Sequence, residues 1–255
     1  MDSGAIAATA LDGIGEIKPG DDLAAIAVAA STTSGLQLGD GQIVVISQKA
    51  VSKAEGRIVL LDNVEPDNRA REVAAATGKD PRFVQLVLDE SVRVLRTAPN
   101  VLITETRQGW ICANAGIDSS NTGGSGTVTL LPADADESAR RIRARLRELT
   151  GTSPAVVITD SFGRPWRRGS VEIAIGCAGI NPLDDWRGRR DMHGSRLRAT
   201  VVSAADQVAS MADLARTKSD GRPVVVIDGL ARLVTPDDGP GATVVQRDRE
   251  RDLFP

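Results

Sequence analysis

Two aspartates each follow a short apolar run with the character of a β-strand. Asp118 ends "WICANAGID" and Asp160 ends "AVVITD". Strand ends are where side chains from distant parts of a sheet can converge on one cleft. Two carboxylates meeting there would suit Mg²⁺ or Mn²⁺, which commonly take one or two carboxylates together with phosphate oxygens. The pair therefore suggests phosphate chemistry, although the same spacing is also typical of aspartates that only cap the following turns.

Groups that could bind phosphate surround these aspartates in the sequence. Lysine and arginine neutralise an anion, and glycines let backbone N–H groups approach it. The candidates are Lys53, Asn121, the backbone of "TGGSG" (122–126), Arg164, Arg167 and Arg168. No GxxxxGK[ST] motif is present, which excludes a Walker-type site, and "TGGSG" alone is more typical of a plain turn. A solvated loop is the alternative role of Arg167 and Arg168.

Other catalytic chemistries find little support. His193 is the single histidine, and no cysteine or second histidine stands at ligand spacing from it. A structural or surface role is therefore favoured for it. Cys112 and Cys177 lie among small apolar residues without a CxxC motif, which predicts two buried free thiols. The absence of GxSxG and of a histidine base disfavours acyl chemistry on serine or cysteine.

The composition indicates a soluble globular protein. Of the 255 residues, 25% are charged and 41% hydrophobic, and the formal net charge is −3. Only 2% are aromatic, so stacking on single-stranded nucleic acid is not expected, and no basic face suggests duplex binding. The N-terminus lacks a basic signal region, and residues 23–39 are too weakly apolar to span a membrane. We expect a cytoplasmic protein forming one folded unit.

The first half of the chain predicts helices, a buried strand and a hairpin. Acidic residues before "LAAIAVAAS" predict a helix start after residue 20, and "GQIVVIS" predicts a buried strand ending near Ser47. Asp67 and Gly78 should bound one helix, and Pro81 should open the next. The segment 100–116, with its central "RQG", predicts a hairpin whose second strand leads to Asp118.

The second half predicts a long helix and two more buried strands. Residues 134–151 carry Ile142, Leu146 and Leu149 on one helical face, opposite an arginine-rich face that we expect to be solvated. A strand should end at Asp160 and be followed by a loop. Residues 200–215 predict a helix, and residues 222–229 predict a buried strand.

Five longer motifs together resemble the coenzyme F420:L-glutamate ligase family, also called F420-0:γ-glutamyl ligase. They are "GDGQIVVISQKAVSKAEGR", "LITETRQGWICANAGIDSSN", "VVITDSFGRPWRRG", "IGCAGINPLDDWRGRRDMHG" and "RDLF". They occur in order over residues 13–254, which is essentially the whole chain.

The resemblance implies an α+β fold peculiar to the family, with mixed and antiparallel sheets, flanking helices and two intimately joined lobes. It implies a single ligase domain over residues 1–255, without the fused C-terminal nitroreductase-like domain of some relatives, and a homodimer. The implied reaction uses GTP, Mg²⁺ or Mn²⁺ (two ions per subunit) and K⁺. It adds L-glutamate to the coenzyme F420 precursor, first through an ordinary amide and then through a γ-linked one.

The resemblance also assigns site residues. Those expected to contact the nucleotide are Ile14, Gly15, Glu16, Ile17, Ser47, Gln48, Lys53 and Asn121. Those expected to hold metal are Asp118, Asp160 and Ser161, and catalysis would depend on Asp118, Asp160 and Lys53. The sequence departs from the family at "GIGEI", and at Lys218, where many relatives have a glutamine near a second metal. A lysine cannot ligate a metal in its charged form, so Lys218 either contacts phosphate or leaves that metal held differently.

The implied mechanism passes through an acyl phosphate formed from GTP. Two alternatives remain open from the residues alone. The first is a metal-dependent phosphohydrolase that uses the same two carboxylates, and the second is a protein that binds nucleotide without catalysis.

Overall fold

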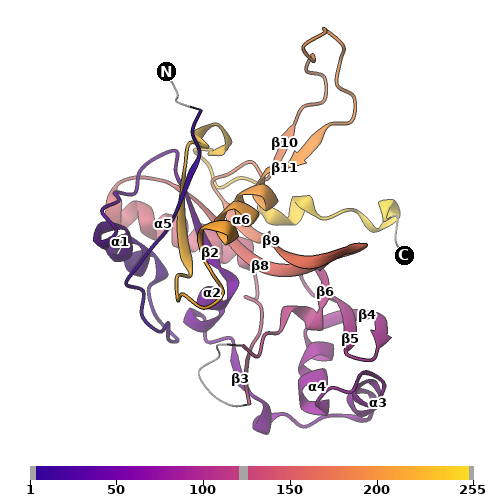
Figure 1. Ribbon diagram of the computed structural model, residues 1–255. Coiled ribbons are helices and arrows are strands. Elements are labelled where there is room, and N and C mark those ends of the chain that lie inside the picture. Colours follow the sequence, from indigo (N-terminus) through magenta and orange to yellow (C-terminus); the bar gives the residue numbers. More distant parts are fainter. Residues whose placement is uncertain (1–3, 121–125, 253–255) are drawn as a thin grey trace.

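The computed structural model describes residues 4–120 and 126–252 and shows helices and strands intermixed along the chain (Figure 1). Its sheets include both parallel and antiparallel pairs. The predicted α+β class is therefore confirmed. Asn121 and most of the "TGGSG" segment lie outside the described residues.

A five-stranded sheet forms the centre of the structure. Its strands follow the order β1 (Ala7–Ala10), β12 (Val224–Asp228), β2 (Ile43–Ser47), β8 (Ala155–Arg164) and β9 (Arg167–Ala178). The pair β2–β8 is parallel and the other three pairs are antiparallel. The apolar runs "IVVI" of β2 and "VVVI" of β12 are completely buried, as expected for strands covered on both faces.

Four helices pack around this sheet. They are α1 (Leu23–Thr33), α2 (Gln48–Ala54), α5 (Ala135–Thr150) and α6 (Ala204–Ala215). In Figure 1, α6 lies in front of the sheet, α5 lies behind it, and α1 packs against α5 at the left edge of the view. The approach of α5 is close, because a Cβ atom on Gly176 of β9 would stand 2.3 Å from the carbonyl carbon of Ala135. Glycine at position 176 is therefore required by packing.

A second group of elements lies below the central sheet in Figure 1. It contains α3 (Asn68–Thr77), α4 (Pro81–Asp89), a sheet of β4 (Ser91–Ala98), β5 (Val101–Thr106) and β6 (Ile111–Ala113), and the pair β3 (Ile58–Leu60) and β7 (Thr127–Thr129). The 3₁₀ turns η1 (Leu61–Asn63) and η2 (Asn114–Gly116) connect them. These elements bury a hydrophobic cluster of their own around Val84, Val87 and Leu102.

The remaining elements follow β9. Strands β10 (Leu183–Asp185) and β11 (Val201–Ser203) begin an arm that projects away from the body of the protein (Figure 1). Three short 3₁₀ turns occur near the C-terminus: η3 (Ala231–Leu233), η4 (Ala242–Val245) and η5 (Arg249–Arg251). Arg249 of η5 is paired with Glu105 of β5 at 2.6 Å, which ties the C-terminal segment to the smaller sheet.

The boundary residues behave largely as predicted. Asp22 and Asp67 accept backbone N–H groups as the N-caps of α1 and α3, and Pro81 opens α4. Gly78 and Gly151 end α3 and α5 in the left-handed conformation, which glycine adopts without steric cost. The "RQG" hairpin is confirmed as the turn between β5 and β6.

The predicted strand ends at the two aspartates are wrong. Strand β8 continues past Asp160 to Arg164 and forms a long hairpin with β9, so the expected loop is mostly strand. Strand β6 ends at Ala113, and η2 separates it from Asp118, which forms an isolated bridge with Thr129. The hairpin partner extends β8 because β9 supplies hydrogen bonds that sequence patterning along one strand cannot reveal.

The predicted amphipathic pattern of α5 is only partly correct. Ile142 and Leu146 are buried, but Leu149 is 40% exposed. Arg143, expected on a solvated face, is only 1% exposed. Its guanidinium donates to the carbonyl oxygens of Pro154, Thr235 and Asp237 and pairs with Asp238 at 2.8 Å. The buried charge of Arg143 is tolerated because its guanidinium is hydrogen-bonded to these carbonyl oxygens and paired with a carboxylate.

No helix within residues 4–120 and 126–252 is long and apolar enough to cross a membrane.

Substituting Arg143 tests its structural role. Arg143→Met removes the donor to three carbonyl oxygens and leaves Asp238 unpaired, so we expect the free energy of unfolding to fall by about 3–5 kcal/mol. Arg140→Met, on the same helix, removes only a 3.4 Å contact with Glu137 and should cost less than about 1 kcal/mol. Urea unfolding of both variants measures the difference, and equal stabilities would contradict the assignment.

Candidate active site

An open cavity of about 640 Å³ lies beside the C-terminal end of β2. Its walls come from the segment before α1, the start of α2, the 118–120 segment, the β8–β9 hairpin and the residues that follow α6. The residues assigned by the resemblance that line it are Gly15, Glu16, Ile17, Ser47, Gln48, Lys53, Asp118, Asp160, Ser161 and Lys218. The structure thus gathers in one cavity most of the residues selected from sequence.

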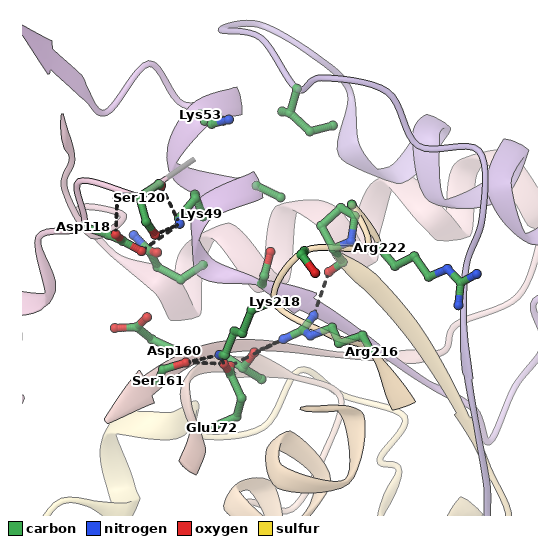
Figure 2. A pocket seen from close by; sticks show the side chains of 18 of the residues that line it. Lys49, Lys53, Asp118, Ser120, Asp160, Ser161, Glu172, Arg216, Lys218 and Arg222 are labelled. Carbon is green, nitrogen blue, oxygen red and sulfur yellow. Dashed lines mark hydrogen bonds and ion pairs between the residues drawn. The ribbon is translucent and has the colours of Figure 1, made fainter. Parts of the chain in front are cut away.

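Asp118 lies on one side of the cavity and is fully engaged (Figure 2). Its Oδ2 pairs with the ammonium of Lys49 at 2.7 Å, and its Oδ1 accepts the backbone N–H of Ser120 at 2.6 Å. Burial acts to raise the pKa of Asp118, but the bonds from Lys49 and Ser120 outweigh it and hold that pKa below its ordinary value. Asp118 is therefore an anion in this cavity.

Asp160 lies on the other side of the cavity and has the opposite electrostatic character. Burial is the main reason why the pKa of its carboxyl rises to about 7, and the neighbouring carboxylates of Glu172 and Asp118 raise it further. No lysine or arginine forms an ion pair with Asp160 in the described part of the chain. Asp118 and Asp160 both line this cavity.

The carboxylate of Glu172 is the common partner of two basic side chains and a hydroxyl group. Glu172 is 5% exposed and lies opposite Ser161 in the register of the β8–β9 hairpin. Glu172 Oε1 accepts from Ser161 Oγ at 2.6 Å and from Lys218 Nζ at 2.8 Å, and Oε2 lies 3.4 Å from Arg216. Burial opposes ionisation, but these bonds outweigh it and lower the pKa of Glu172.

Arg216 and Lys218 follow the end of α6, and their side chains point toward the Glu172 carboxylate (Figure 2). Arg216 is 9% exposed and also donates to the carbonyl oxygen of Pro223 and to Thr159 Oγ1. The Lys218 ammonium contacts Ser161 Oγ in addition to Glu172, and it lies 3.5 Å from Asp213. Lys218 therefore places a positive charge directly against Ser161, one of the expected metal ligands.

Lys53 and Gln48 come from α2 and make different contacts. The Lys53 ammonium binds Glu16 Oε1 at 2.5 Å, although the lysine residue itself is only 7% exposed. The side-chain amide of Gln48 donates to Ser52 and to the carbonyl oxygen of Leu130. Gln48 thus uses its amide group to anchor α2, while Lys53 connects α2 to the "GIGEI" segment.

Several predicted residues do not line the cavity. Ile14 packs against the main hydrophobic core, and Arg164, Arg167 and Arg168 lie in the outer part of the β8–β9 hairpin. His193 is exposed in the projecting arm, which agrees with the surface role favoured from sequence. Asn121 lies outside the described residues.

Sequence reasoning missed Lys49, Glu172 and Arg216. A signal existed for Lys49, because it stands four residues before Lys53 and residues at that spacing share one face of a helix. Glu172 is the single acidic residue in the apolar run "SVEIAIG". A charged side chain in a buried strand needs an opposite charge or hydrogen bonds, so this position could have been recognised as paired. Arg216 follows the end of a helix and carries no comparable signal.

Both cysteines are buried and free, as predicted. Burial, together with the charge of nearby Asp160, raises the pKa of the Cys112 thiol to about 12, and burial raises that of Cys177 as well. The thiolate is the reactive form of cysteine. Neither side chain is therefore suited to act as a nucleophile near neutral pH.

The site has oxygen donors of the kind that Mg²⁺ and Mn²⁺ prefer. Asp118, Asp160 and Ser161 all line the cavity. Within residues 4–120 and 126–252, however, no three Asp, Glu, His or Cys side chains are grouped so that they could hold a metal alone. Two carboxylates and a hydroxyl fit an ion that completes its coordination with water and phosphate oxygens, as Mg²⁺ commonly does.

Comparisons with known proteins find similar sequences over most of the chain. Residues 13–229 match the family model described as F420-0:Gamma-glutamyl ligase. The chain is 44% identical to the coenzyme F420:L-glutamate ligase of Methanopyrus kandleri, over 94% of this chain and 93% of that protein. It is 42% identical to the protein of the same name from Methanothermobacter thermautotrophicus, over 96% of both chains. The corresponding protein of Archaeoglobus fulgidus is 43% identical over 86% of both chains.

Neutralising Glu172 tests the cation cluster. In Glu172→Gln, Arg216 and Lys218 lose their shared anion, and the buried arginine keeps only neutral acceptors. We expect the free energy of unfolding to fall by about 3 kcal/mol. Glu137→Gln, at a carboxylate that is half exposed, should cost less than about 1 kcal/mol. Denaturant unfolding of the two variants checks this, and an unchanged midpoint for Glu172→Gln would show that the cluster adds nothing.

The raised pKa of Asp160 predicts a pH dependence of stability. Between pH 3.8 and about 7 the folded protein holds a proton on Asp160 that the unfolded chain releases. The free energy of unfolding should therefore fall as the pH rises through this range, by at most about 4 kcal/mol. Asp160→Asn lacks this proton, so its stability should fall less over the same range. Unfolding curves from pH 4 to 8 compare the two proteins, and parallel profiles would contradict the shift.

Proposed function

The chain belongs to the F420-0:gamma-glutamyl ligase family, and from this premise we propose that it joins L-glutamate to the coenzyme F420 precursor with GTP as the phosphoryl donor. The observation that supports the proposal most directly is the pairing of Asp118 and Asp160 on the walls of one cavity that also holds lysines. A volume of about 640 Å³ lies in the usual range for a small-molecule site. The relatives named above are called coenzyme F420:L-glutamate ligases.

Amide formation from a carboxylate requires activation, because a carboxylate oxygen is a poor leaving group. In the proposed reaction, a carboxylate oxygen of the precursor attacks the γ-phosphorus of GTP, and GDP leaves. The amine of L-glutamate then attacks the acyl phosphate, the amine proton is lost, and inorganic phosphate leaves. Positioning and charge stabilisation are the main contributions of a protein to such a transfer.

The residues of the cavity fit these two tasks. Asp118, Asp160 and Ser161 would hold the divalent ion, which supplies charge neutralisation of phosphate oxygens when bound. Lys53 adds a positive charge from the wall formed by α2. Catalytic work would therefore rest on Asp118, Asp160 and Lys53.

The nucleotide would lie along the wall formed by the N-terminal segment and the end of β2. Gly15, Glu16, Ile17 and Ser47 line the cavity there, and Lys218 lines it from the segment that follows α6. In our proposal the bound GTP contacts these residues together with Gln48, Ile14 and Asn121. The short "GIGEI" segment can approach a ligand closely because Gly15 carries no side chain, and space around its Cα is open.

Further parts of the proposal come from family membership alone. They are a homodimer, a stimulatory K⁺ ion, a cytoplasmic location and successive addition of glutamates, first through an amide and then through a γ-link. The binding of two divalent ions by each subunit, which the resemblance implies, belongs to the same proposal.

One assay tests the proposed function. The full chain is incubated with GTP, Mn²⁺, L-glutamate and the deazaflavin precursor, and the products are identified by mass spectrometry. A ligase gives a precursor heavier by one or more glutamate residues, with GDP formed in step. Phosphate release that does not need glutamate would identify a phosphohydrolase instead, and nucleotide binding without any product would identify a non-catalytic protein.

Asp160→Asn tests the role of the carboxylate. The change removes a negative charge from the metal position but no core packing, so we expect glutamate addition with GTP and Mn²⁺ to fall by about 100-fold or more. Asp62→Asn, at a side chain that is 75% exposed and does not line the cavity, serves as the control and should keep full activity. Turnover of Asp160→Asn near the wild-type rate would show that the metal assignment is wrong.

A further inference from the structure

Lys49 makes contacts that no assigned role explains. Its ammonium donates to Asp118 Oδ2 at 2.7 Å, to the carbonyl oxygen of Ser120 at 2.7 Å and to Ser120 Oγ at 2.9 Å. An ammonium group has three N–H donors, so all of them are used by one short segment of chain. Figure 2 shows Lys49 reaching this segment from α2 across the edge of the cavity. Lys49 is therefore the counter-ion of Asp118 in this state of the protein.

This pairing gives each carboxylate oxygen of Asp118 a bonded partner. Oδ2 is bound by Lys49, and Oδ1 accepts the backbone N–H of Ser120. Asp160 differs, because no ion pair connects it to a basic side chain in the described residues. A divalent ion can therefore reach Asp160 without disturbing an ion pair, but it meets the ammonium of Lys49 at Asp118.

We propose that Lys49 is a displaceable counter-ion, which leaves Asp118 when a divalent cation binds and then pairs with a phosphate group of the nucleotide. The proposal rests on the proposed function for the identity of the nucleotide. It assigns a role to a residue that the sequence resemblance left without one. Lys49 thereby couples the binding of the cation to the binding of the nucleotide.

The chain favours Lys49 over Lys53 for this movement. Both lysines line the cavity from α2, four residues apart on one face of the helix. Lys53 is nearly buried and held by Glu16, whereas the side chain of Lys49 is 22% exposed and borders the open space. Lysine has a flexible four-carbon stem, so its ammonium can change partners without movement of the helix.

Electrostatics requires a new partner for the displaced ammonium. A charge that leaves an ion pair loses its attraction to that partner unless another opposite charge replaces it. Nucleotide phosphates supply that charge beside the same cation. Cation and nucleotide should therefore each bind more tightly in the presence of the other, by the same factor.

The test compares Lys49→Met and Lys49→Gln with the wild-type chain. Binding of Mn²⁺ is measured by the electron paramagnetic resonance signal of free Mn²⁺, with and without a GTP analogue that has a β,γ-imido bridge. Without nucleotide, loss of the competing ammonium should tighten Mn²⁺ binding roughly tenfold in both variants. At saturating Mn²⁺, the affinity for the analogue should fall roughly tenfold, because its phosphates lose a cation.

Two further variants serve as controls. Lys49→Arg keeps the positive charge and should keep Mn²⁺ binding close to the wild-type value. Lys79→Met removes a lysine that lies near Phe83, far from the cavity, and should change neither affinity. Circular dichroism of each variant confirms that it is folded, and Lys49→Gln retains a polar side chain in case Lys49→Met is not.

The outcomes separate this proposal from the proposed function. Mn²⁺ binding that is unchanged or weaker in Lys49→Met and Lys49→Gln would overturn the counter-ion role. Unchanged affinity for the analogue would overturn the phosphate contact. If the wild-type chain added no glutamate to the precursor, the proposed function would fail, but the Mn²⁺ comparison would still decide the role of Lys49.

Discussion

Four carboxylates line one cavity, and ion pairs with basic side chains reduce their mutual repulsion. Glu16 is paired with Lys53, Asp118 with Lys49, and Glu172 with Lys218 and Arg216. Asp160 has no such partner among the described residues, and its pKa rises to about 7 because burial and two neighbouring anions disfavour its charge. Among the described residues Asp160 is therefore the carboxyl group of the cavity that a cation can approach without first breaking an ion pair.

The fold brings these groups together from strands, from α2 and from the segments that join the elements. The parallel pair β2–β8 places the start of α2 beside Asp160, because α2 begins where β2 ends. The β8–β9 hairpin places Glu172 opposite Ser161 by its register. The residues after α6 then close the cluster with Arg216 and Lys218.

Sequence reasoning found most of the candidate site but for a partly incorrect reason. Asp118 and Asp160 do line one cavity, yet neither is the last residue of a strand, because β8 continues into a hairpin and η2 follows β6. The residues that compensate their charges were missed, apart from Lys218. Pairing partners such as Arg216 and Glu172 lie 44 residues apart, and only the folded chain brings them together.

Most helix boundaries, the buried strands and the family could be read from the order of the amino acids. Caps at Asp22 and Asp67, the left-handed glycines and the apolar strand runs follow from short-range backbone and side-chain preferences, and five ordered motifs carry the resemblance. Which charges meet could be known only from the folded chain. Folding buried Arg143, paired Lys49 with Asp118 and left Asp160 without a partner. Such pairings depend on distances between elements, since electrostatic energy follows separation in space and not separation along the chain.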